Sequence, residues 1–116
     1  MQYKLIAMDM DGTLLNSQKE VSQRSKESLK KASDMGLKLV VCTGRIFTSA
    51  KTFARIIGTK APIIASNGAY IREKDDDRVI FEKHLETEDL EKIINITKNM
   101  DFFLNYLLLI LSFLKN

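Results

Sequence analysis

The sequence predicts an α/β fold in which parallel strands alternate with helices. Three short apolar runs, at residues 5–8, 37–42 and 62–66, have the length and composition of buried strands. Amphipathic segments of helical period lie between them, at residues 22–35 and 46–57, and a glycine follows each one closely. Strand–helix–strand connections of this kind are right-handed, so the ends of the strands should meet at one end of a parallel sheet.

The size and charge of the chain narrow the class of protein. A chain of 116 residues with 28% charged residues predicts one globular domain with a real core rather than disorder. The net charge of +3 is spread along the helices, which favours anionic small molecules and gives no nucleic-acid footprint. No apolar run has the length of about 20 residues that a membrane span needs.

Cysteine use and the N-terminus point to one compartment. Cys42 is the single cysteine, which excludes a disulfide framework and favours a reducing cytoplasm. Because it ends an apolar strand, we expect a buried structural thiol rather than a nucleophile. The chain enters its first strand almost at once and shows no signal sequence. We therefore expect a cytoplasmic protein.

Two carboxylates directly follow the first strand. Asp9 and Asp11 stand two positions apart, where like charges are costly unless a cation joins them. Gly12 lets the backbone turn sharply and approach a bound group closely. Mg²⁺ prefers oxygen ligands and commonly takes one or two carboxylates plus phosphate oxygens. The pattern predicts a Mg²⁺ site in which one aspartate attacks phosphorus and the other handles the proton of the leaving group.

Two other interpretations of this segment fit less well. An EF-hand calcium loop that starts at Asp9 requires glycine at its sixth position, where the sequence has Leu14. A turn rich in aspartate for local hydrogen bonding leaves the apolar run before the pair, and the two leucines after it, unexplained.

A second polar segment, Thr43-Gly44-Arg45, follows the second strand and is expected beside Asp9. A hydroxyl and the backbone N–H groups at the start of a helix are good donors to phosphate oxygens. Threonine is also a common helix N-cap, but the phosphate role is favoured because it agrees with the aspartate pair. Arg45 suits either a phosphate or a carboxylate at the same end of the sheet, and both readings stay open.

Residues 69–116 predict a hairpin, a helix and an apolar tail. Segments 69–72 and 79–81 predict a hairpin closed over three aspartates at 75–77, which suit a solvated turn better than a metal cluster. An amphipathic helix is expected over residues 87–100. Residues 101–116 are apolar without helical or alternating period.

The motif at residues 9–15, DMDGTLL, resembles the first motif of the haloacid dehalogenase superfamily, DxDGT[LV]. The match is closest to the Cof-type sugar-phosphate phosphatases of that superfamily. Thr43-Gly44-Arg45 resembles its second motif, and SNGA at residues 66–69 is typical of the Cof-type branch. The resemblance implies a Rossmann-like, parallel three-layer core and Mg²⁺-dependent hydrolysis of phosphomonoesters. A small phosphorylated metabolite, such as a sugar phosphate, is the expected partner.

The resemblance also assigns roles to particular residues. Asp9 is the nucleophile and a metal ligand. Asp11 is the general acid and then the base that activates water, and its carbonyl oxygen contacts Mg²⁺. Thr43 binds the oxygens of the phosphoryl group. The remaining candidates for phosphate or substrate contacts lie in the turns after the three strands: Gly12, Gly44, Arg45 and Asn67. For Asn67 a simple turn role has equal weight.

The resemblance divides the chain and leaves it incomplete. Residues 1–72 correspond to the N-terminal part of the core and residues 73–100 to the start of an α/β cap, and the family pattern is expected to end near Met100. The family completes its site with a lysine and one or two further aspartates from later motifs, which this sequence lacks. We therefore expect a truncated chain with impaired activity and with its first strand as an exposed edge.

Two other functions compete with the phosphatase. One is a catalytically silent fragment that binds a partner or its own copy through the exposed edge and the apolar tail. The other is a phospho-receiver domain, which the length suits. Receivers accept phosphate on an aspartate after the third strand, and residues 63–68 contain no aspartate. The receiver hypothesis is therefore the least favoured of the three.

Overall fold

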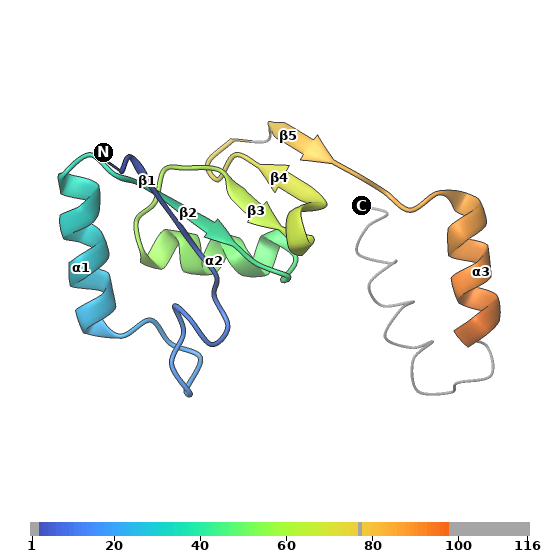
Figure 1. Cartoon of the computed structure of the whole chain (residues 1–116), viewed down its shortest axis with the longest axis horizontal. Helices are drawn as coiled ribbons and strands as arrows, with labels where there is room; N and C mark the ends of the chain where they lie inside the picture. The colour runs from blue at the N-terminus through green and yellow to red at the C-terminus, as the bar shows by residue number, and fades with distance from the viewer. Residues whose placement is uncertain (1–2, 77, 98–116) are drawn as a thin grey trace. The chain divides into compact units, whose positions relative to one another are not determined.

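The computed structural model of the chain describes residues 3–76 and 78–97. The chain divides into two compact units, Met1–Lys83 and His84–Asn116. The first contains a sheet and two helices, and the described part of the second contains one helix (Figure 1).

The first unit confirms the predicted α/β fold. Strands and helices alternate along the chain up to the third strand, and two antiparallel strands follow. A short 3₁₀ turn at Ser66–Gly68 separates the third and fourth strands. The elements are β1 (Leu5–Met8), α1 (Gln23–Asp34), β2 (Lys38–Cys42), α2 (Phe47–Ile56), β3 (Ile63–Ala65), β4 (Tyr70–Arg72) and β5 (Val79–Glu82).

The five strands form one sheet in the order β1-β2-β3-β4-β5. β1, β2 and β3 are parallel, with Met8 opposite Val41 and Val41 opposite Ile63. These three strands therefore end together, at what we call the carboxyl end of the sheet. β4 runs antiparallel to β3, and Arg72 lies opposite Ile63. The turn between β4 and β5 consequently lies at the other end, the amino end.

Both helices of the first unit pack on the same face of the sheet. Leu29 of α1 and Ala54 of α2 belong to one apolar cluster with Leu39 and Val41 of β2. These two β2 residues are two positions apart and so point to the same side. The connections β1-α1-β2 and β2-α2-β3 both move in the same direction along the sheet. Because such connections are right-handed, both helices lie on one face. The described part of the first unit thus supplies two layers of the expected three-layer core.

β1 lies at one side of the sheet and is less buried than its composition suggests. Its four residues alternate between exposed and partly buried, and Leu5 remains 50% exposed. The apolar run was predicted to be buried on both faces, and that prediction is wrong. The expectation of an exposed first strand is confirmed, because β2 is its one neighbour among the strands of the described residues.

α1 has a defined cap at each end. Ser22 is the N-cap, and its hydroxyl oxygen accepts a hydrogen bond of 3.1 Å from the Ser25 backbone N–H. The helix ends before Gly36, whose φ of +88° lies in the left-handed region that favours glycine.

In the second unit, α3 covers Thr87–Thr97 and carries Glu88 and Asp89 in its first turn. The predicted end of this helix near residue 100 and the apolar tail lie outside the described residues. β5 pairs with β4 in the sheet of the first unit. The proposed start of a cap at residue 73 stays a prediction. None of the helices described is long and apolar enough to cross a membrane.

Candidate active site

Three turns meet at the carboxyl end of the sheet, and two of them are joined by backbone hydrogen bonds. The Asn67 N–H donates to the Thr43 carbonyl at 3.0 Å, and the Ser66 N–H donates to the Arg45 carbonyl at 2.9 Å. The turn after β2 and the turn after β3 therefore form one connected wall.

The turn after β1 presents its two carboxylates to solvent. Met10 is fully buried, and its carbonyl accepts hydrogen bonds from the backbone N–H groups of Leu14 and Leu15. Asp9 and Asp11, one position to either side of Met10, are exposed. Burial of Met10 thus anchors the turn and turns both acids outward.

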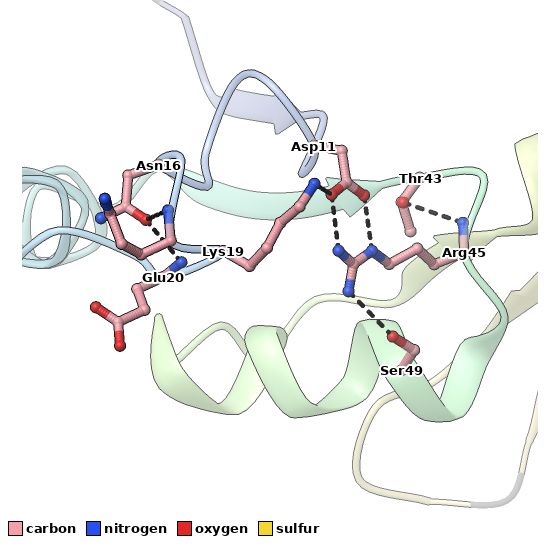
Figure 2. A network of polar contacts seen from close by, with 8 residues as sticks. Asp11, Asn16, Lys19, Glu20, Thr43, Arg45 and Ser49 are labelled. Atoms are coloured by element: carbon pink, nitrogen blue, oxygen red, sulfur yellow. Dashed lines mark hydrogen bonds and ion pairs between the residues drawn. The ribbon is translucent and has the colours of Figure 1, made fainter.

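Asp11 lies in a network of cations from two other segments (Figure 2). Arg45 binds it in a bidentate manner, with Nε 2.7 Å from Oδ2 and Nη2 2.7 Å from Oδ1. Lys19 places Nζ 3.0 Å from Oδ1. Arg45, and after it Lys19, hold the pKa of the Asp11 carboxyl well below its usual range, and Asp11 in turn raises the pKa of Arg45. Asp11 is therefore ionised and held in place.

Asp9 differs from Asp11 in its surroundings. Its carboxylate makes no hydrogen bond or ion pair with any residue in the ranges 3–76 and 78–97. Burial raises the pKa of the neighbouring Cys42 thiol, and the Asp9 charge raises it further. Cys42 is partly buried rather than fully buried as predicted. A thiol with a raised pKa is a poor nucleophile, which agrees with the structural role predicted for Cys42. Asp9 is thus the acid at this end of the sheet that has room for a ligand.

Thr43 does not cap the helix that follows it. The N-cap of α2 is Ile46, which makes no side-chain capping bond, so the N-cap interpretation of Thr43 is wrong. Thr43 is buried, with 6% of the residue exposed. Its hydroxyl oxygen accepts a hydrogen bond of 3.1 Å from the Arg45 N–H. The hydroxyl keeps its own proton as a donor for another group.

Gly44 and Asn67 are in contact across the two joined turns. A Cβ at position 44 would lie 3.0 Å from the Asn67 Oδ1 atom, so glycine permits the close approach. Asn67 has φ of +54°, a left-handed conformation that asparagine tolerates better than most residues. This turn geometry accounts for Asn67 locally, and its amide also lies at the wall of the site.

The oxygen donors at this end suit a hard cation in part. In the ranges described, no three His, Cys, Asp or Glu side chains are grouped to share a metal. Mg²⁺ needs fewer, since it commonly takes one or two protein carboxylates and keeps several waters. The Asp9 carboxylate and the Asp11 carbonyl are of the right chemistry. The Asp11 carboxylate is already occupied by Arg45 and Lys19, so it fits the metal role less well.

The aspartate run at 75–77 lies at the amino end of the sheet, away from these residues. Asp75 pairs with Lys74 at 2.5 Å, and the Asp76 Oδ1 accepts a hydrogen bond of 2.8 Å from the Arg78 N–H. Asp77 lies outside the described residues. The described part of the run is a turn, as the sequence predicts.

Lys19 is the site residue that sequence reasoning missed. Residues 16–21 read as a polar connection with little information. In the structure the Asn16 Oδ1 accepts hydrogen bonds from the backbone N–H groups of Gln18 at 3.0 Å and Glu20 at 2.9 Å (Figure 2). Asparagine is a frequent organiser of such turns, so Asn16 is the signal in the sequence that could have indicated a structured loop.

Comparison with known proteins identifies the family of the chain. The family model for haloacid dehalogenase-like hydrolases matches residues 6–113, which extends beyond Met100, the predicted end of the family pattern. Phosphatase YwpJ of Bacillus subtilis is 40% identical over 72 residues, which is 62% of this chain and 25% of that protein. The 5-amino-6-(5-phospho-D-ribitylamino)uracil phosphatase YwtE of the same organism is 41% identical over 70 residues, or 60% of this chain and 24% of that protein.

A solved structure shares the fold. A haloacid dehalogenase-like hydrolase from Bacteroides thetaiotaomicron superposes with a TM-score of 0.76 at 30% identity. The superposition covers 84% of this chain and 38% of that protein. The chain spans between 24% and 36% of the length of curated relatives that it matches.

Proposed function

Because the chain belongs to the haloacid dehalogenase-like hydrolase family, we propose that it carries the nucleophilic part of a Mg²⁺-dependent phosphomonoester hydrolase. The proposed reaction passes through an aspartyl-phosphate on Asp9. The expected substrates are small sugar phosphates in the cytoplasm. The name of one relative gives a phosphorylated ribityl compound as its substrate, which supports this class.

The contrast between the two acids carries the proposal. A carboxylate nucleophile must be ionised and must have no partner that blocks its lone pairs. Among the described residues Asp9 has no hydrogen-bond or ion-pair partner on its carboxylate, whereas Asp11 is bound by Arg45 and Lys19. Asp9 is therefore the better nucleophile, and proton transfer is assigned to Asp11, the other carboxylate at this end of the sheet.

The reaction then has two steps. Oδ of Asp9 attacks phosphorus, the ester P–O bond breaks, and Asp11 gives its proton to the leaving oxygen. Asp11 next takes a proton from water, whose oxygen attacks phosphorus and displaces Asp9 with release of phosphate. Asp11 must be protonated for the first step, so its ion pairs with Arg45 and Lys19 have to open. The incoming substrate supplies competing anions for these cations.

Other groups at the site bind the phosphoryl oxygens. We assign the Thr43 hydroxyl and the Gly44 N–H as donors to the phosphoryl oxygens. Gly12 would let the backbone of the turn after β1 approach the bound phosphate closely. Mg²⁺ held by Asp9 and the Asp11 carbonyl would act as a Lewis acid and orient the phosphate. Asn67 would border the substrate.

The second candidate function is a silent fragment that self-associates. It is favoured by β1, which pairs with β2 alone among the described strands and leaves Leu5 50% exposed, because an exposed edge strand is a template for pairing. The two functions make opposite predictions about turnover.

Phosphate release separates them. The full chain is assayed with 4-nitrophenyl phosphate, with and without Mg²⁺, beside Asp9→Asn and the control Asp34→Asn. Asp34 is an exposed aspartate at the end of α1, so its substitution should leave the rate unchanged. We expect Asp9→Asn to lower turnover by at least about 10³-fold. Equal and negligible rates in all three proteins, or Mg²⁺-independent turnover that survives Asp9→Asn, would overturn the proposal.

A further inference from the structure

We propose that Lys19 is a substrate-recognition residue that selects phosphate esters whose leaving group carries a second negative charge. The charge could be a carboxylate or another phosphate. This inference rests on the proposed function, because it takes Asp11 as the group that protonates the leaving oxygen.

The charges around Asp11 leave one cation in surplus. Arg45 alone contacts both carboxylate oxygens, at 2.7 Å each. Lys19 adds a contact of 3.0 Å to Oδ1, an oxygen that Arg45 already occupies. Glu20, the acid next to Lys19 in the sequence, points its carboxylate away from the network (Figure 2). One carboxylate therefore faces two cations, and the second cation can be given to a ligand.

The position of this surplus charge defines which part of a substrate it meets. Asp11 acts on the leaving oxygen, so groups that surround its carboxylate line the leaving-group side. Thr43 and its backbone N–H groups, in the wall of the site, serve the phosphoryl side. Lys19 touches Asp11 and comes from a different turn, so its ammonium group faces the leaving group rather than the transferred phosphoryl.

The backbone holds Lys19 there at a conformational cost. Lys19 has φ of +62°, a left-handed conformation that lysine adopts rarely. Two hydrogen bonds to the Asn16 side chain stabilise this turn, and a bridge between the buried residues Leu15 and Val21 closes its base. Residues held in such conformations by their surroundings cluster at active sites and ligand-binding segments.

The side chain itself can change partners. Lys19 is 65% exposed and its contact with Asp11 is a solvent-accessible ion pair, which contributes little to stability. A ligand anion can therefore replace Asp11 as its partner at small cost.

Equilibrium binding of two phosphonates tests the proposal on the full chain. Phenylphosphonate and 4-carboxyphenylphosphonate differ by one carboxylate on the side that mimics the leaving group. Their dissociation constants are measured by titration calorimetry at low salt with excess Mg²⁺. We expect the carboxylated ligand to bind about three- to fivefold more tightly, in line with one exposed ion pair. The preference should shrink at high salt.

Three variants assign the preference to the ammonium group. Lys19→Asn removes the charge but keeps a residue that tolerates the left-handed turn, and should abolish the preference. Lys19→Arg should retain it. Lys60→Asn removes an exposed lysine just before β3, at the amino end of the sheet, and should leave the preference unchanged.

The outcomes separate this inference from the function it rests on. If neither phosphonate binds, the proposed function fails and the inference fails with it. If both bind with equal affinity, or if Lys19→Asn keeps the preference, the phosphate site stands and the assignment of Lys19 is wrong.

Discussion

The two ends of the sheet differ in which residues hold the left-handed backbone conformations of their turns. At the amino end, the left-handed positions are glycines, Gly36 at φ +88° and Gly58 at φ +69°. The carboxyl end also has two positive-φ glycines, Gly12 and Gly68, and in addition three residues other than glycine in left-handed conformations: Lys19, Ser66 and Asn67. Glycine adopts this conformation without a steric penalty, whereas a side chain pays for it in strain. The strained side chains gather where the strands end, which is the end where open α/β sheets bind ligands.

Buried hydroxyl groups show the same difference. Thr59, at the amino end, is 3% exposed, and its hydroxyl donates to the Leu39 carbonyl and accepts from the Ala61 N–H. Thr43, at the carboxyl end, is similarly buried but accepts one N–H and keeps its proton available. One end of the sheet satisfies its polar groups internally, and the other leaves donors and carboxylates for a ligand.

Replacement of each threonine by valine, which has nearly the same shape, should have the largest effects and should affect different properties at the two ends. Thr43→Val removes a phosphate donor and should lower Mg²⁺-dependent turnover by about 10²-fold. Thr59→Val leaves the Leu39 carbonyl and the Ala61 N–H without their partner, and should lower the free energy of unfolding by about 1–3 kcal/mol. Turnover is measured by phosphate release and stability by urea unfolding.

Each variant serves as the control for the other. Thr43→Val should change stability less than Thr59→Val, because the Arg45 N–H that it releases is only partly buried. Thr59→Val should leave the turnover of the folded protein unchanged. If both variants lower the free energy of unfolding and neither lowers the turnover of the folded protein, then both threonines are structural. The two ends of the sheet would then not differ in ligand binding.

A smaller effect concerns acid stability and the ion pair at the carboxyl end. Arg45, followed by Lys19, lowers the pKa of Asp11 in the folded chain below its unfolded value of about 3.9. A lowered pKa stabilises the fold above that value, and the contribution is lost as the pH falls through the folded pKa. Arg45→Gln should therefore destabilise the chain near about pH 6, with the difference from wild type shrinking toward about pH 2.

Urea unfolding at both pH values checks this prediction. The matched control is Lys30→Gln, which removes the exposed ion pair between Lys30 and Asp34 on α1. The effect should be small, because Asp11 is itself exposed. A difference between Arg45→Gln and wild type that is the same at both pH values would show that the Asp11–Arg45 pair does not form in solution.

Local sequence signals predicted most of this fold. Helical period and capping residues such as Ser22 define α1 to within a residue, and the hairpin between β4 and β5 follows from alternation around a turn. The burial of β1 was predicted wrongly, because an apolar run shows what a strand can bury and not which neighbour covers it. Leu5 carries the same side chain whether it is covered or half exposed.

The site could be predicted only as far as its short motifs reach. Asp9, Asp11 and Thr43 follow directly from where strands end. The partner of Arg45 stayed open between phosphate and carboxylate, and in the structure it is Asp11, 34 positions earlier in the chain. Lys19 was missed because its placement depends on a left-handed turn that Asn16 organises, which no residue period records.

The central claim is that Asp9 becomes phosphorylated, and chemical trapping tests it most directly. The full chain is incubated with 4-nitrophenyl phosphate and Mg²⁺, quenched in acid and reduced with borohydride, which converts an aspartyl-phosphate to homoserine. Peptide mass spectrometry then locates the modified position. We predict homoserine at position 9 and an unmodified aspartate at position 11. Homoserine at position 11, or no modification while phosphate is released, would contradict it.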